Sequence, residues 1–337
     1  RRRRRRHQYQ KGVVVNGGSV SLRAAAAESG DTSGRSSVPE LFRGRTTRQA
    51  VFRVAWPAVA IGLLRTALGQ VDAYMIGRLG ALELQAIGAA SFAVWLVYIA
   101  GELVSVGVHA LAAEAEGKGD RNAAAEAVAQ GFHFSILVSL LTCVATLGAP
   151  GLLARYFRIV GVRDARVLRA GESYLRVTAA FGTLPLSMSA CASAGFKGIG
   201  ETRPSLVIAS LAVALNALLN WPFIKIWGVA GAAWATNLAS AVACVASVVV
   251  LARCYDVVVP FPFLGSRLRW RAISKIATIG APLASSGALF SAVYVALGSL
   301  VAAIDPLLLA SLGVGHRIEA VAYTACEGYA VACATCV

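Results

Sequence analysis

Long apolar runs, separated by short polar or glycine-rich stretches, dominate the chain from residue 54 to its end. A helix that crosses the hydrocarbon core of a bilayer needs about 20 consecutive, mostly apolar residues. The runs are long enough for this, and few charges fall inside them. They predict eight membrane-spanning helices, at residues 54–77, 84–112, 122–149, 168–194, 204–226, 230–252, 272–304 and 307–337.

The longest internal connection between these spans is basic and contains Pro260 and Pro262. We therefore expect residues 51–253 to form a six-helix N-terminal lobe, residues 254–271 to link the lobes, and residues 272–337 to begin a C-terminal lobe. The expected fold class is all-α: a polytopic membrane helical bundle with a complete six-helix N-lobe and the first one to two helices of a C-lobe. Because the last apolar run is still continuing at Val337, we expect the chain to be truncated after the start of the second lobe.

A shift of 225 residues aligns the first two spans with the last two. It brings Pro57, Gly62, Gly88, Tyr98 and Glu102 onto Pro282, Gly287, Gly313, Tyr323 and Glu327. Such identities arise easily in apolar helices, so alone they are weak. The shift moves the chain by six spans, and an even number gives parallel repeats, as in one known transporter architecture. A substrate path would then lie between the lobes.

Composition agrees with a membrane location. The chain is 57% hydrophobic and 15% charged, whereas soluble domains carry about 25% charged residues. Thirteen of the 32 Lys and Arg residues lie in residues 1–53, starting with the run Arg1 to Arg6. A basic tail ahead of an apolar body indicates a membrane-surface or targeting signal and not a nucleic-acid partner. Residues 1–50 are thus expected to be a disordered or targeting tail, either an organellar transit peptide or, since no Met begins the chain, an artefact.

Ionisable residues inside the spans are the first candidates for function, because each costs about 3 kcal/mol to insert. Asp72 lies within Gly69-Gln70-Val71-Asp72-Ala73-Tyr74, late in the first span. A carboxylate that gains and loses charge can couple proton or cation binding to a conformational change. The alternative is a solvated or structurally paired Asp72. Glu102, with His109 two turns later, is either a relay or a packing group.

Amides in the fifth span are the next candidates. Asn216 and Asn220 are four residues apart and so share one helix face. They either line a polar cavity or hydrogen-bond a neighbouring helix. The seven cysteines and four histidines suggest no disulfide framework or metal cluster, and the glycine clusters fit no phosphate-binding loop. We therefore expect no metal, no cofactor and no enzymatic activity.

Several of these segments together resemble the multidrug and toxic compound extrusion (MATE) family. The segments are Ala55-Trp56-Pro57, Val71-Asp72, Ile76–Gly80, Glu116–Asp120, Gly195–Pro204, Asn216–Asn220 and Gly228–Thr236. Lys197 stands where the family usually has Arg. The ordered set is specific although each piece alone is not, and the resemblance extends over residues 50–337.

The resemblance implies a secondary antiporter of twelve helices in two lobes, exchanging small organic substrates for protons or sodium ions. Asp72 would be the coupling carboxylate, and Asn216 would line the cavity of the N-terminal lobe. Our own candidates for the substrate cavity are Asn216, Asn220, Tyr74 and Gln70. Some family branches have a second acid where this chain has Asn220. Glu102 matches no family motif. We expect a monomer in the lipid bilayer, in the plastid envelope if the tail is a transit peptide and otherwise in the plasma or vacuolar membrane.

Two other functions stay open at this point. A flippase for lipid-linked precursors, from the same wider superfamily, should have more basic residues inside its spans; within residues 51–253, only Arg65 and Arg176 lie away from the span ends. A membrane-embedded enzyme would need a catalytic constellation.

Overall fold

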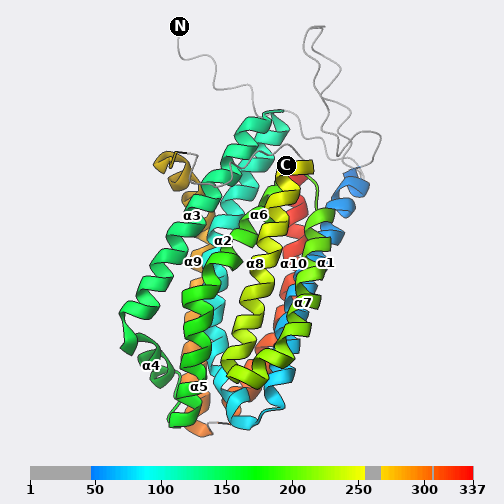
Figure 1. Ribbon diagram of the computed structural model, residues 1–337. Coiled ribbons are helices and arrows are strands. Elements are labelled where there is room, and N and C mark those ends of the chain that lie inside the picture. Colours follow the sequence, from blue (N-terminus) through cyan, green and yellow to red (C-terminus); the bar gives the residue numbers. More distant parts are fainter. Residues whose placement is uncertain (1–46, 255–266, 306, 337) are drawn as a thin grey trace, which may run out of the picture. The chain divides into compact units, whose positions relative to one another are not determined.

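The computed structural model describes residues 47–254, 267–305 and 307–336, and all of its regular elements there are helices (Figure 1). These elements are α1 (Thr47–Gly77), α2 (Ala81–Gly117), α3 (Arg121–Gly148), α4 (Pro150–Ile159), α5 (Ala165–Arg176), the π-helix η3 (Val177–Gly182), α6 (Thr183–Gly198), α7 (Arg203–Trp227), α8 (Val229–Cys254), α9 (Trp270–Ile304) and α10 (Leu308–Cys336). Most of the basic tail and of the expected linker lies outside the described residues.

Seven segments of the described chain are long and apolar enough to cross a membrane. One of them, Ala165–Gly198, combines α5, η3 and α6. The predicted polytopic helical bundle is thereby confirmed. The eighth predicted span forms α10, which is not among the seven and carries Arg317, Glu319 and Glu327. The short helix α4 lies between the third and fourth predicted spans, where the apolar pattern predicted no element.

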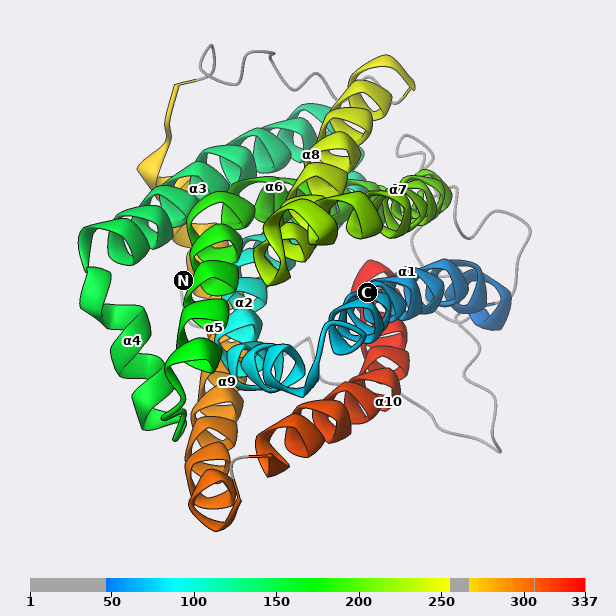
Figure 2. The same cartoon turned by 60° about the horizontal axis from the view of Figure 1, so that its bottom comes forward.

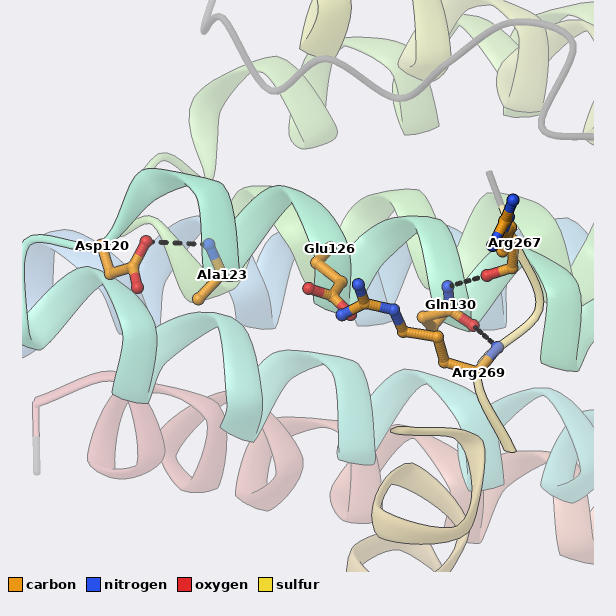
Figure 3. Close-up of polar contacts among 6 residues, drawn as sticks. All are labelled: Asp120, Ala123, Glu126, Gln130, Arg267 and Arg269. Atoms are coloured by element: carbon orange, nitrogen blue, oxygen red, sulfur yellow. Dashed lines mark hydrogen bonds and ion pairs between the residues drawn. The ribbon is translucent and has the colours of Figure 1, made fainter. Parts of the chain in front are cut away.

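The turns between helices follow from local sequence. Asp120 caps α3, since its carboxylate accepts a hydrogen bond from the N–H of Ala123 at 3.0 Å (Figure 3). Gly119 and Gly200 follow α2 and α6 with φ of 72° and 77°, a conformation that costs glycine little. The two glycine clusters, Gly117-Lys118-Gly119 and Gly195–Gly200, are therefore turns that end α2 and α6.

The π-helix η3 lies within a span, where every backbone group needs a partner. The carbonyl of Val177 accepts a hydrogen bond from the side chain of Asn237 on α8 at 3.1 Å. A neighbouring helix thus satisfies the irregular backbone, and Asn237 is buried with it.

Helix α2 lies in the middle of the bundle and contacts α3, α5, α6, α9 and α10 (Figure 2). Close packing between these helices depends on small residues. A Cβ atom on Gly313 of α10 would lie only 2.8 Å from the Cα of Gly88 on α2. These two glycines correspond under the 225-residue shift. The crossing of α2 and α10 therefore needs glycine on both sides.

The contacts of α9 and α10 with the first two helices are related by the same shift. Helix α10 packs on α1, and α9 packs on α2. Gly62 of α1 faces Thr324 of α10, and the shifted pair, Gly287 of α9 and Ile99 of α2, also lies in contact. The two copies therefore meet through equivalent helix pairs. The division into two lobes at residues 254–271 stays a prediction.

The chain enters α9 through a polar anchor on α3 (Figure 3). The buried side chain of Gln130 donates to the carbonyl of Arg267 and accepts from the N–H of Arg269, both at 3.0 Å. Arg269 also pairs with Glu126 at 2.6 Å, with both side chains largely exposed. The Gln130 amide thus satisfies two backbone groups just before α9 begins.

We expect Gln130→Ala to lower the stability of the protein by about 2 kcal/mol, because it leaves two backbone groups without their partner. The melting temperature of the purified protein in detergent measures this. Glu126→Gln removes only an exposed ion pair and should cost less than about 1 kcal/mol. Equal melting temperatures for Gln130→Ala and wild type would show that the anchor does not stabilise the fold.

Candidate functional site

The Asp72 carboxylate lies inside the bundle, where α1, α7 and α8 meet. Its side chain is 6% exposed. The Nδ2 of Asn220 on α7 donates to Oδ1 of Asp72 at 2.5 Å, and the hydroxyl of Thr236 on α8 lies 3.1 Å from Oδ2. Three helices thus supply a polar site within apolar surroundings.

Asn216 completes the network one turn before Asn220. Its side chain is fully buried. In the orientation of the amide that satisfies its neighbours, the nitrogen lies 3.2 Å from Oδ1 of Asp72, and the oxygen accepts from the N–H of Thr236 at 3.2 Å. The shared helix face predicted for Asn216 and Asn220 is therefore turned towards the carboxylate.

The hydroxyl of Thr236 has three acceptors within reach, one of which is the Asn216 oxygen at 2.9 Å. The hydroxyl also lies 3.1 Å from Asp72 Oδ2 and 3.0 Å from the carbonyl of Ala232. A hydroxyl has one proton and two lone pairs. It can donate to an ionised Asp72, or accept from a protonated Asp72 while donating to Ala232.

An apolar cluster lies next to the network on all three helices. Ile76 on α1, Ile224 on α7 and Ala232 on α8 are each one turn from a member of the network, and each is at most 2% exposed. They pack together in one core cluster. This cluster covers one side of the site with apolar side chains.

The structure places the other predicted site residues elsewhere. Gln70 donates to the backbone carbonyl of Arg317 on α10 at 3.2 Å. Tyr74 is 68% exposed. Glu102 pairs with Arg65 on α1 at 3.2 Å, with side-chain exposures of 23% and 35%. The substrate role of Gln70 and Tyr74 and the relay role of Glu102 stay predictions.

Two residues near Asp72 carried no signal that we used in the sequence. Thr236 ended one of the family segments, but a threonine in a membrane helix commonly bonds its own backbone. Arg317 lies in the last span and donates to the carbonyl of Gly69 at 2.7 Å. Its charge also acts on Asp72. An arginine in an apolar segment was the signal that could have identified it.

Comparison with known proteins now adds to this geometry. Residues 57–222 match the protein-family model described as MatE. "Probable multidrug resistance protein NorM" of Thermotoga maritima is 23% identical over 309 residues, covering 90% of this chain and 64% of its own length. A protein of the same name from Deinococcus radiodurans is 31% identical over 199 residues, covering 57% of this chain and 43% of that protein. The names describe multidrug resistance proteins and not enzymes.

Solved structures agree in fold. An outward-facing multidrug resistance MATE family transporter of the MOP superfamily superposes with a TM-score of 0.74 at 21% identity, over 90% of this chain and 66% of that one. An inward-facing structure with the same description gives 0.68 at 20% identity, over 82% and 64%. The chain thus spans about two thirds of the length of these proteins. The family model, the relatives and the fold agree: this integral membrane protein belongs to the MATE family of transporters.

Proposed function

We propose that the protein is a secondary active antiporter, which exports small organic metabolites or xenobiotics in exchange for protons or sodium ions. Asp72 is its coupling carboxylate. The observation that carries this proposal is the buried network of Asp72 with Asn216, Asn220 and Thr236. The names of the relatives as multidrug resistance proteins support the substrate class.

The network supports coupling because it accommodates a carboxylate in both charge states. An ionised Asp72 accepts from Asn220 and Thr236. A protonated Asp72 donates to the Thr236 hydroxyl, which turns to the Ala232 carbonyl. Neither state leaves a hydroxyl proton without an acceptor, so proton uptake does not cost a lost hydrogen bond.

Sodium is the second coupling ion that the donors suit. The buried oxygen Oδ1 of Asn220 has no hydrogen-bond partner among the described residues. Together with the carboxylate of Asp72 and the hydroxyl of Thr236, it supplies oxygen ligands of the kind that hard cations prefer. Sodium would be bound as transported ion and released as substrate enters.

The organic substrate cation and the coupling ion would compete for the same negative charge, that of Asp72. An organic cation and the coupling ion each favour an ionised Asp72, so each binds in place of the other. The apolar cluster of Ile76, Ile224 and Ala232 keeps the carboxylate from water on one side, which strengthens this competition. Because the substrate and the coupling ion use the same carboxylate as counter-charge, they are exchanged across the membrane and not transported together.

The proposal is tested with the complete gene product in liposomes loaded with ethidium, a fluorescent organic cation. A pH gradient or a sodium gradient is imposed across the membrane, one at a time. We expect ethidium to leave faster with one of the two gradients than without any. Efflux that is insensitive to both gradients would contradict antiport.

The proposal has three further parts. Residues 254–271 connect two lobes, the protein is a monomer, and it lies in a plastid, plasma or vacuolar membrane. The internal repeat supports the first, since α9 and α10 correspond to α1 and α2. The basic composition of residues 1–50 supports a targeting tail.

A further inference from the structure

Arg317 joins the second copy of the repeat to the helix that carries Asp72. It lies on α10, and α10 packs along α1 (Figures 1 and 2). Its guanidinium donates to the carbonyl of Gly69 at 2.7 Å. The neighbouring side chain on α1, Gln70, donates back to the carbonyl of Arg317 at 3.2 Å. Each helix thus donates one side-chain hydrogen bond to a backbone carbonyl of the other, and both bonds lie at the same height along α1.

The same level of α1 carries the coupling group. Gly69 is three residues before Asp72, less than one helical turn. Because Arg317 bonds to Gly69, its positive charge lies on the same stretch of α1 as the Asp72 carboxylate and contributes to the electrostatics of that group. One side chain of α10 therefore bonds to the α1 backbone and also carries a charge that acts on Asp72.

Loss of the negative charge on Asp72 makes the partly buried position of Arg317 less favourable. While Asp72 is ionised, the guanidinium has a counter-charge next to a partly buried position. Once Asp72 is neutralised, Arg317 loses that counter-charge and keeps its bond to the neutral Gly69 carbonyl, and a poorly compensated charge away from water is unfavourable. Separation of α10 from α1, which lets Arg317 reach water, is then favoured.

We propose that Arg317 is a positioning residue: it holds α10 against α1 while Asp72 is ionised and releases it when the coupling ion neutralises Asp72. This inference rests on the proposed role of Asp72. It assigns to Arg317 the transmission of that charge to the contact between the two copies of the repeat.

Other titratable groups face the same region. Tyr98 on α2 and Tyr174 on α5 each interact electrostatically with both Asp72 and Arg317. His316 and Glu319 flank Arg317 on α10, with 3.8 Å between His316 Nδ1 and a Glu319 carboxylate oxygen. Arg65 acts on Tyr98 and is itself paired with Glu102. Histidine is the side-chain type whose ordinary charge change falls between about pH 5 and 8, so His316 needs its own control.

A cysteine pair can report the contact between α1 and α10. The hydroxyls of Thr66 on α1 and Thr324 on α10 lie 3.1 Å apart. The variant Thr66→Cys/Thr324→Cys, in the complete gene product with its native cysteines replaced by alanine, should form a disulfide when the helices are in contact. The matched control is Ser193→Cys/Ser205→Cys, because these hydroxyls on α6 and α7 lie 2.6 Å apart, and both lie within residues 51–253.

The rate of copper-phenanthroline cross-linking of the α1–α10 pair is measured across pH and divided by the rate of the control pair, which removes the pH dependence of thiol oxidation. A second series at constant pH replaces sodium by choline. We expect the normalised rate to fall when protons or sodium neutralise Asp72. Asp72→Asn and Arg317→Gln should each make it low and constant. Arg317→Lys and His316→Gln should keep the response, which shows that charge at position 317 is what matters.

The outcomes separate the two proposals. A response that Asp72→Asn removes but Arg317→Gln retains would overturn the role of Arg317 and leave that of Asp72 intact. A response that persists in Asp72→Asn would overturn both. Loss of the response in His316→Gln would assign the effect to His316 and contradict the inference.

Discussion

Replacing Asp72 by Asn should reduce gradient-driven ethidium efflux to the level of protein-free liposomes. The amide has the size of the carboxylate and its oxygen can still accept from Asn220, so the network and the fold should persist. It carries no charge in any condition, however, and binds no proton or sodium ion. The conformations that are open to either side of the membrane then no longer differ in ion binding, so an ion gradient cannot drive the change between them.

The control for this variant is Glu172→Gln on α5, which removes a carboxylate outside the Asp72 network and should leave efflux near wild type. Both variants should elute from size exclusion as wild type does. Undiminished efflux by Asp72→Asn would make Asp72 a structural residue.

The second large effect is expected from Gly280→Val at the contact of α9 with α2. A Cβ atom at Gly280 would overlap the backbone carbonyl of Leu103 and lie 3.1 Å from its Cα. On the facing side, a Cβ at Gly107 would lie 2.8 Å from the Cα of Ile276. Because the obstacle is backbone and not a flexible side chain, the helices must move apart. We expect a cost above about 3 kcal/mol and little monodisperse protein in detergent.

A glycine without near neighbours provides the comparison. Gly315 lies on α10 with no atom within 4 Å of a Cβ built there, so Gly315→Ala should be tolerated. Monodisperse Gly280→Val protein with an unchanged melting temperature would show that α9 does not pack on α2 as described.

The sequence predicted the spans well because their signal is local. An uninterrupted apolar run reports a membrane helix without knowledge of its neighbours. The short helix α4 was missed because it is too short to give an apolar run of the length that marks a span. The 225-residue shift identified Gly88 and Gly313 as equivalent, but the contact between them depends on how α2 and α10 cross.

The site was only partly predictable for the same reason. Asp72, Asn216 and Asn220 stood out as polar residues within apolar spans, and the structure brings them together. The pairing of Arg65 with Glu102 depends on the rotation of two helices, which no spacing within either helix reveals. Glu327 matched Glu102 under the shift, and its charge interacts with both Arg65 and Glu102 in the structure.

The most direct test of Asp72 as the coupling group is the release of ions when purified protein binds ethidium in weakly buffered detergent solution. Protons are followed with a pH indicator and sodium with a sodium-selective electrode. Wild type should release one of the two ions as ethidium binds, because both compete for the ionised carboxylate. Asp72→Asn should release neither. Ion release by Asp72→Asn equal to that of wild type would contradict the account.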